Sequence, residues 1–374
     1  MLIDDNFDSG NIKVISQTDK KNIQLEIKKD NMSDFYQWFH FKVELKQLEA
    51  LSFSINNLET SAYPLGWENY NVVATYDKKD YFRIPSSYNN GQLSFSLKPK
   101  HSTIYLSYFA PYSYDRHLEL LTQYQSKDNV RLETLGKTFD GRDISLLNIG
   151  QYDSNKKNIW IIARQHPGET MAEWFIEGFL EKLFNPHSSV SLNLLKEANI
   201  FVVPNMNPDG SVRGYLRTNA KGINLNREWQ EPSKDKSPEV YFVRQKMLET
   251  GIDMFLDIHG DEAIPFNFID GCEGTPSYNA KMANLENTFK ENLKIITPDF
   301  QTQYGYEADQ YGEANLTVGS KWVGENFKCL SLTVEMPFKD HDSQAQPQFG
   351  WSPERSKNYG QDMLTAINTV IKDL

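Results

Sequence analysis

Cysteine is scarce in this chain, and the two cysteines present, Cys272 and Cys329, lie far apart in the sequence. A disulfide framework needs several cysteines, and disulfides are rare in the reducing cytosol. The first eight residues include three aspartates and lack the apolar stretch of a secretion signal. Both absences predict a cytoplasmic protein that carries two reduced thiols.

Long apolar runs are absent as well. No stretch reaches about 18 consecutive apolar residues, the length that a membrane-spanning helix needs, so we expect no membrane span. Basic residues are outnumbered, because 39 Lys and Arg stand against 50 Asp and Glu, a net charge of −11. This balance argues against nucleic acid as a partner, since nucleic-acid-binding surfaces carry an excess of positive charge.

Apolar material is sufficient for a large core, because 39% of the 374 residues are hydrophobic and 13% are aromatic. Residues 1–112 contain short β-like segments separated by turn residues such as Asn89-Asn90-Gly91. This spacing predicts an N-terminal antiparallel β-sandwich domain of about seven to nine strands. The expected strands are 22–28, 38–43, 51–55, 71–76, 81–84, 92–97 and 103–109.

The pattern changes in residues 113–374, where strands and helices alternate. A hairpin over 134–150 is expected to turn at Asp140-Gly141. Alternation of this kind predicts an α/β domain with a mixed sheet covered by helices on both faces. The expected strands are 159–164, 199–203, 254–258 and 329–335, and the expected helices are 117–125, 170–184, 238–250, 277–293 and 353–372.

His166 and Glu169 lie where the strand 159–164 gives way to a helix, after a break at Pro167-Gly168. In open α/β sheets this edge is where ligands bind. An imidazole nitrogen and a carboxylate oxygen are both good zinc ligands, and a catalytic zinc takes three protein ligands plus water. His259 follows another apolar strand at the same predicted edge and supplies the third ligand.

Two further segments end at that edge. The connection 204–229 carries Arg217, Asn226 and Arg227, and arginine presents a planar fork that matches a carboxylate. The strand 329–335 ends in Glu335, an acid in a position where a carboxylate is costly unless it is paired or functional. Near a metal such an acid can serve as a general base and then as a proton donor. Glu262, three residues after His259, is a rival for this role.

In this order, His166-Pro-Gly-Glu169, Asn207-Pro-Asp-Gly210, Arg217, Asn226-Arg227, His259 and Glu335 resemble the zinc metallocarboxypeptidases. The closer likeness is to the cytosolic carboxypeptidases, whose eukaryotic members trim glutamates from protein tails. That subfamily has an N-terminal β-sandwich, and the segment 109–118 resembles its junction signature. The likeness therefore covers most of the chain, although only by layout over the first 100 residues.

The resemblance implies one Zn²⁺ per chain, held by His166, Glu169 and His259. It implies that Arg217 stabilises the oxyanion of the tetrahedral intermediate and that Glu335 is the base and acid. Asn226 and Arg227 would bind the terminal carboxylate of a peptide or protein substrate. The implied activity is hydrolysis of the C-terminal peptide bond.

Details of the resemblance leave several residues open. Many members have an acid two residues before the Asn-Arg pair, supporting the first histidine, where this chain has Asn224. A tyrosine covers the substrate in the digestive enzymes, and Tyr304, Tyr306 or Tyr311 could take that place. Lys321 falls where related enzymes line the specificity pocket and would favour an acidic C-terminal residue such as Glu; Arg213 is the other candidate.

Three other functions compete with the carboxypeptidase. The same site would suit an N-acyl amino-acid amidohydrolase, although the sandwich and the junction signature favour the peptidase. A non-catalytic protein that binds C-termini should have lost a metal ligand or the base. All four of these residues, His166, Glu169, His259 and Glu335, are intact. A structural zinc site should be rich in cysteine, whereas Cys272 and Cys329 do not have ligand spacing.

Overall fold

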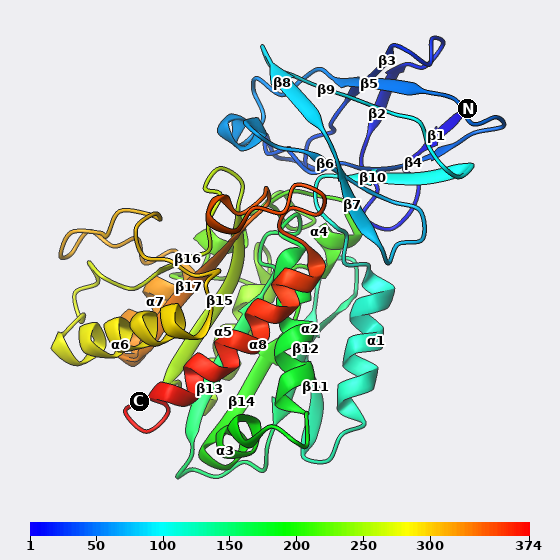
Figure 1. Ribbon diagram of the computed structural model, residues 1–374. Coiled ribbons are helices and arrows are strands. Elements are labelled where there is room, and N and C mark those ends of the chain that lie inside the picture. Colours follow the sequence, from blue (N-terminus) through cyan, green and yellow to red (C-terminus); the bar gives the residue numbers. More distant parts are fainter.

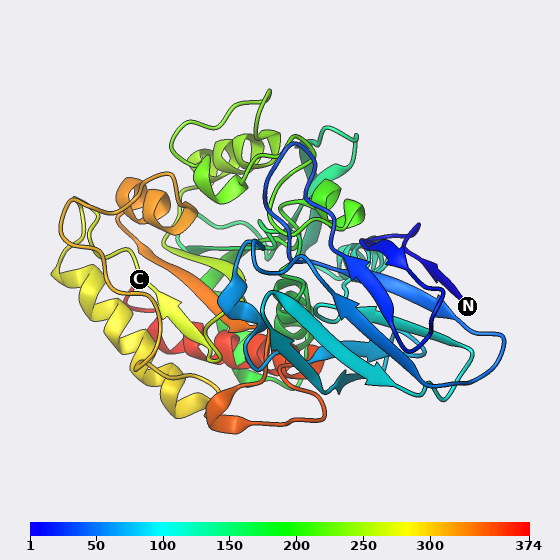
Figure 2. The ribbon, with the colours of Figure 1, turned by 90° about the horizontal axis from the view of Figure 1, so that it is seen from above.

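A computed structural model describes residues 1–374. Figure 1 shows two bodies, a β-sandwich formed by the N-terminal residues and a larger helix-covered sheet, with the sandwich on one end of the sheet. Viewed from above in Figure 2, the sandwich strands, coloured blue to cyan, lie beside the loops of that end. No helix combines the length and the apolar character that crossing a bilayer demands.

The sandwich consists of two five-stranded sheets, in the orders β1-β4-β10-β6-β7 and β2-β3-β5-β9-β8. Its ten strands exceed the expected number, because β1, β2 and β8 are only three or four residues long, too short to show a strand pattern in the sequence. All pairs are antiparallel except β3 with β5, which run parallel. The strands are β1 Leu2–Asp4, β2 Lys13–Ser16, β3 Ile23–Glu26, β4 His40–Glu44, β5 Leu51–Ile55, β6 Val72–Thr75, β7 Tyr81–Ile84, β8 Ser86–Asn89, β9 Gln92–Leu97 and β10 Thr103–Ser107.

The second body contains a seven-stranded mixed sheet in the order β11-β12-β14-β13-β15-β17-β16. Its centre, β14-β13-β15-β17, is parallel, while β12 and β16 pair antiparallel with their neighbours. The predicted hairpin is β11 and β12, with Gly141 in the turn at φ +82°, where a side chain is disfavoured. The strands are β11 Val130–Lys137, β12 Asp143–Ile149, β13 Lys157–Ala163, β14 Ala198–Val203, β15 Met254–Asp261, β16 Phe268–Asp270 and β17 Leu330–Pro337.

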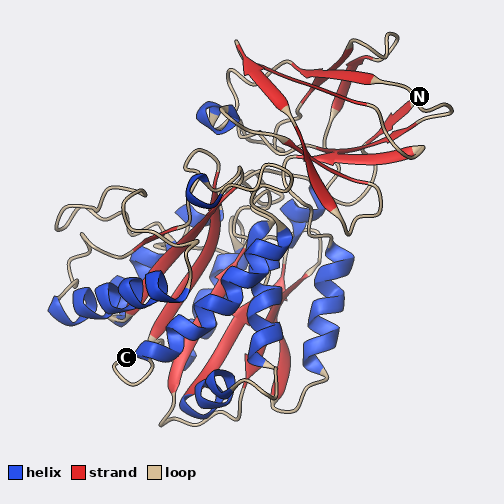
Figure 3. Ribbon diagram, in the orientation of Figure 1, coloured by secondary structure: helices blue, strands red, loops and turns tan.

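Helices cover both faces of this sheet (Figure 3). Alternate residues of β13 face opposite sides: Ile159 and Ile161 belong to the core under α2 and α8, and Trp160 to the core under α5 and α7. The helices are α1 Tyr114–Gln125, α2 Met171–Leu183, α3 Ser189–Glu197, α4 Pro208–Arg213, α5 Pro238–Thr250, α6 Ala280–Ile296, α7 Gly319–Phe327 and α8 Pro353–Val370. The sequence patterns missed α3, α4, α7 and β16, all of which are short.

The parallel order brings the carboxyl ends of β13, β15 and β17 to one edge of the sheet. In the register of β15 with β17, His259 lies directly opposite Glu335. The segment that carries His166 and Glu169 follows β13, the neighbour of β15 on its other side. Three strands far apart in the sequence therefore deliver the predicted ligands and the predicted base to the same place.

Candidate active site

The chain reverses sharply after β13, and Arg164 makes this turn with φ +57°, a conformation that a non-glycine residue rarely adopts. The Arg164 guanidinium is buried, and it donates to the carbonyls of Pro167 (2.9 Å) and Tyr112 (2.9 Å) and to Glu173 (2.5 Å). These bonds offset the strain of the turn and hold the segment that aims His166 into the cleft.

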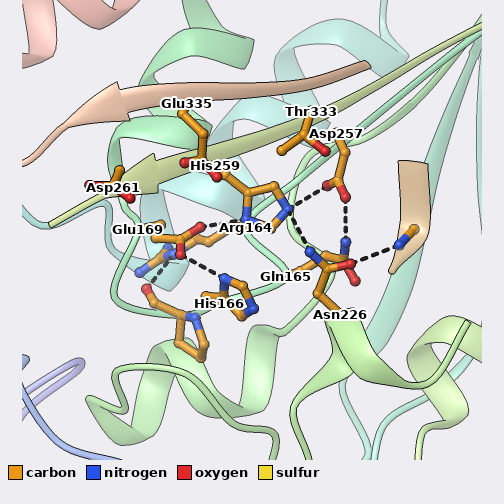
Figure 4. Close-up of polar contacts among 12 residues, drawn as sticks. Arg164, Gln165, His166, Glu169, Asn226, Asp257, His259, Asp261, Thr333 and Glu335 are labelled. Atoms are coloured by element: carbon orange, nitrogen blue, oxygen red, sulfur yellow. Dashed lines mark hydrogen bonds and ion pairs between the residues drawn. The ribbon is translucent and has the colours of Figure 1, made fainter. Parts of the chain in front are cut away.

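His166, Glu169 and His259 form a buried donor group (Figure 4). Glu169 Oε1 lies 2.6 Å from His166 Nδ1, and its Oε2 lies 2.7 Å from His259 Nδ1. One donor atom from each residue lies within 4.8 Å of the others, so one ion could contact all three. Two imidazole nitrogens and a carboxylate oxygen fit zinc, and three protein ligands leave the open position of a catalytic site.

The protonation states of His166 and Glu169 agree with a metal site, whereas His259 must lose a proton to bind a metal. Burial lowers the pKa of His259, but the carboxylates of Asp257 and Glu169 raise it well above its ordinary value. Burial, together with the charge of Arg217, lowers the pKa of His166 to about 4, so its imidazole is neutral, the form that binds metals. Burial would raise the pKa of Glu169, but the two imidazoles beside it lower the pKa below its ordinary value. The carboxylate is therefore ionised and available as a ligand.

Each imidazole has a partner at its other nitrogen. Asn224 Oδ1 lies 3.1 Å from His166 Nε2. The asparagine therefore supports the first histidine, as an acid does in many members of the family that the sequence resembles. Asp257 Oδ1 lies 2.9 Å from His259 Nε2, and its Oδ2 accepts from Gln165 at 2.6 Å. Such partners fix each ring so that its Nδ1 faces Glu169 within the donor group. Asp257 was not predicted, although its position two residues before His259 in the same strand was the available signal.

Glu335 is buried, and its Oε2 has no hydrogen-bond partner. Burial raises the pKa of this carboxyl well above its ordinary value, and the nearby carboxylates of Glu169 and Asp261 add to the rise. A buried acceptor without a partner costs free energy, which suits a group that awaits a ligand. The rival Glu262 also lines the cleft, but its Cβ lies close to Gly66 on the sandwich side, where a methyl group on Gly66 would meet it at 2.9 Å.

Arg217 lies against the sandwich, with its guanidinium carbon 5.5 Å from the ring centres of both Phe35 and Tyr63. Tyr63 also lines the cleft, so the sandwich forms part of its wall. The loop of Arg217 is held by Asp30 of the sandwich, whose carboxylate accepts from the amides of Leu216 (2.8 Å), Arg217 (2.9 Å) and Thr218 (2.9 Å). Nothing in the sequence signalled Asp30, because it reads as an ordinary turn residue.

Replacing Asp30 with Asn is expected to lower kcat about tenfold while KM changes less, because the amide group would face backbone donors and Arg217 would lose its position. Burying unsatisfied donors should also reduce the free energy of unfolding by about 1–3 kcal/mol. Steady-state kinetics and thermal unfolding measure both effects. Asp34→Asn is the matched control, since Asp34 is fully exposed and pairs only with Lys29 at the surface. An unchanged kcat for Asp30→Asn would contradict the positioning role.

Asn226 and Arg227 form a short 3₁₀ turn, Leu225–Arg227, beside the donor group. The Asn226 side chain accepts from the amide of Gly319 at 2.8 Å, and its Nδ2 lies 3.5 Å from His259 Nε2. Arg227 is exposed and has no acidic partner; it donates to the carbonyl of Asn226 at 2.6 Å. Its guanidinium therefore keeps donors available for an added carboxylate.

All seven predicted site residues line one cleft of about 380 Å³. A larger groove of about 920 Å³ lies between the sandwich and the start of α8 and contains none of them. The seven are His166, Glu169, Arg217, Asn226, Arg227, His259 and Glu335.

The structure distinguishes among the candidate tyrosines. Tyr306 lines the cleft, and its hydroxyl donates to Asp261 at 2.8 Å and lies 3.4 Å from Glu335 Oε1. Tyr304 instead stacks on Phe266, and Tyr311 is exposed with its hydroxyl on the carbonyl of Pro276. Of the three candidates, Tyr306 is therefore the one that can reach a bound substrate.

The two candidates for the specificity pocket are also separated. Lys321 lines the cleft and is buried, and its ammonium lies near Asp270 and Asp309. Arg213 does not line the cleft, because it ends the short helix α4 and pairs with both oxygens of Asp140 at 2.8 Å. The thiols Cys272 and Cys329 are free and buried outside the cleft.

A sheet edge that gathers a His-Glu-His donor set, a buried acid and two arginines defines a metallohydrolase. The family model for zinc carboxypeptidase matches residues 117–365, and the model for the cytosolic carboxypeptidase N-terminal domain matches residues 3–109. The chain belongs to the zinc carboxypeptidase family and is a metallocarboxypeptidase.

Solved structures share this fold over the whole chain. A metallo-carboxypeptidase from Pseudomonas aeruginosa is 45% identical and one from Burkholderia cenocepacia is 43% identical. Each has a TM-score of 0.97, with 100% of both chains covered. Among curated proteins, mouse cytosolic carboxypeptidase 6 is 30% identical to this chain. The alignment covers 71% of this chain and 54% of the mouse protein.

Proposed function

We propose that this protein removes single C-terminal residues from peptides or protein tails with one zinc ion held by His166, Glu169 and His259. The observation that carries the proposal is the convergence of this donor group, two arginines and the unpartnered acid Glu335 in one cleft. The Pseudomonas protein is in complex with (2-guanidinoethylmercapto)succinic acid, a dicarboxylic acid, which supports a carboxylate-binding cleft.

Each side chain takes a role that its position supports. When bound, zinc would supply Lewis acidity at the scissile carbonyl and lower the pKa of water. Asn226 and Arg227 hold the terminal carboxylate, which fixes the bond that is cut. Arg217 donates to the carbonyl oxygen as negative charge develops there, a contribution that is strong in a site partly closed to water. Glu335 takes the proton of the attacking water and passes it to the leaving amine.

The carboxylate clamp gives a direct prediction. Arg227→Ala should raise KM for peptides with a free C-terminus by about tenfold or more and change kcat less, because it removes a ground-state contact. Peptides with an amidated C-terminus should be poor substrates for both the wild-type protein and the variant. Their kcat/KM should hardly change with the substitution. Steady-state kinetics on matched free and amidated peptides measure this. Equal losses on both substrates would remove Arg227 from the clamp.

The specificity proposal is a preference for an acidic C-terminal residue such as Glu. Its support is Lys321, a cationic side chain that reaches the cleft from the first turn of α7. Gly319, two residues earlier in that turn, donates to Asn226 of the proposed clamp. A side chain that extends from a clamped C-terminal residue therefore has a basic group within the same part of the cleft.

Two wider proposals accompany the activity. We propose that the chain divides into a sandwich domain, 1–112, and a catalytic domain, 113–374; β10 ends at Ser107 and α1 begins at Tyr114. We also propose a cytosolic location, supported by the two free thiols and by the names of the curated relatives.

The test of the function is release of amino acids from a mixed peptide library by the zinc-loaded protein, repeated after a chelator. Zinc-dependent release of single C-terminal residues is the expected result, and the residue released first reports the specificity. No release, with zinc still bound at one per chain, would overturn the proposal. A screen of N-acyl amino acids would then test the amidohydrolase alternative.

A further inference from the structure

Lys321 already has two carboxylate partners within the cleft. Its ammonium lies 3.2 Å from Asp270 Oδ2 and 3.0 Å from Asp309 Oδ2. The Lys321 side chain is only 6% exposed, so its charge depends on these neighbours more than on water. A substrate carboxylate that binds Lys321 must therefore join or replace one of the two.

The two partners differ in how firmly they are held. Asp270 ends the edge strand β16, where it pairs with Thr333 of β17, and its side chain is 15% exposed. Asp309 lies on the irregular segment between α6 and α7, and its side chain is 36% exposed. Asp309 is thus the partner that can leave at lower cost.

Replacing Asp309 by a substrate carboxylate requires Asp309 to move, and hydrogen bonds on either side of it confine that movement to a short segment. On one side, Tyr306 is tied to Asp261 through its hydroxyl. On the other, the amides of Gly312 and Ala314 both donate to the carbonyl of Gly274, at 2.8 and 3.3 Å. The exchange therefore requires movement only of the few residues between these contacts, which belong to neither helix.

We propose that Asp309 is a specificity-determining residue whose carboxylate occupies the place of the substrate's terminal side-chain carboxylate and is displaced by it. This inference rests on the proposed function. A glutamate side chain conserves the number of ion pairs at Lys321 when it replaces Asp309. A neutral side chain cannot replace that ion pair, so Asp309 stays in place and narrows the pocket. The aspartate thereby sharpens the preference that Lys321 creates.

The test compares release of Glu and Ala from peptides that differ only in the last residue. Asp309→Asn should raise kcat/KM for the Glu peptide about fivefold, mainly through KM, because it removes the competing carboxylate. The Ala peptide should change by less than about twofold. Glu307→Gln is the matched control, because Glu307 is an exposed acid of the same segment and pairs with no lysine. This substitution should leave kcat/KM for both peptides unchanged.

Lys321→Met should lower kcat/KM for the Glu peptide about tenfold or more. In that background Asp309→Asn should have no further effect on the Glu peptide, since the two residues act through one ion pair. A loss of Glu release in Asp309→Asn, an equal change for Glu and Ala, or an equal effect of Glu307→Gln would overturn the role of Asp309. Preferential release of Lys or Arg that Asp309→Asn abolishes would overturn it as well, by showing that Asp309 binds a cationic side chain. Absence of release from any peptide by the wild-type protein would instead overturn the proposed function.

Discussion

Glu335→Gln is expected to lower kcat about a thousand-fold while the protein still binds one zinc per chain. General acid–base catalysis by one positioned side chain contributes about 10²–10⁴-fold, and glutamine cannot accept or return the proton. Glutamine has the same shape, so the buried site at the end of β17 should keep its packing. Steady-state kinetics on a C-terminal Glu peptide, with zinc content measured on the same sample, test the prediction.

The argument for Glu335 rests on its surroundings. It faces His259 across the β15–β17 pair, and its Oε2 is buried without a partner. Because most buried polar atoms are hydrogen-bonded, this free oxygen, which lies in the cleft beside the donor group, is available to a water molecule or a substrate. Arg164 shows the contrast, since its buried guanidinium donates to two carbonyls and to Glu173.

Glu262→Gln is the control, because Glu262 lines the cleft three residues after His259 and was the rival candidate. This variant should retain activity within about tenfold of the wild type. Glu262 packs against Gly66 of the sandwich, a position that favours a structural role over proton transfer. A fully active Glu335→Gln, or a Glu262→Gln as inactive as expected for Glu335, would reverse the assignment.

The residues that converge in the cleft were predictable from sequence because each follows an apolar strand or a polar turn that marks the sheet edge. Periodicity places His259 and Glu335 at the ends of buried strands, and a parallel sheet brings such ends together. The ordered resemblance then supplied roles that no single motif carries. Local pattern and tertiary position agreed at these residues.

Contacts between domains were not predictable. Asp30 accepts from three amides around Arg217, which lie 186 to 188 positions further along the chain, and no local pattern encodes that distance. The paired state of Lys321 was hidden for the same reason, because Asp270 and Asp309 reach it from separate segments. The sequence predicted a cation for the pocket, whereas the structure shows that this cation is already neutralised.

Short elements were missed for a different reason. The helix α4 has six residues and begins at Pro208, and β16 has three residues, so neither is long enough to show a period. Tertiary contacts stabilise them: β16 pairs with β17, and Asn207 caps α4 by accepting from Gly210 at 3.1 Å. In the sandwich, β1 and β2 escaped prediction in the same way.

The second large effect is expected from Glu169→Gln, which should weaken zinc binding more than about 100-fold and abolish zinc-dependent activity. Removing a partner of a ligand already costs 10–100-fold in metal affinity, so loss of a charged ligand should cost more. Glu169 is the residue that contacts both imidazoles through its two oxygens, whereas glutamine offers only one oxygen to them. Zinc per chain after dialysis measures the change.

Thermal unfolding separates this loss from misfolding. A ligand that binds only the folded state adds about 4 kcal/mol at a free concentration 1,000 times its Kd, so zinc should raise the Tm of the wild-type protein clearly. Glu169→Gln should unfold cooperatively near the Tm of the chelated wild type and gain almost nothing from added zinc. Glu262→Gln should keep the full zinc-dependent increase in Tm, because Glu262 bonds to neither imidazole. If Glu169→Gln kept that increase too, zinc would be held elsewhere, and the donor group of His166, Glu169 and His259 would lose its assignment.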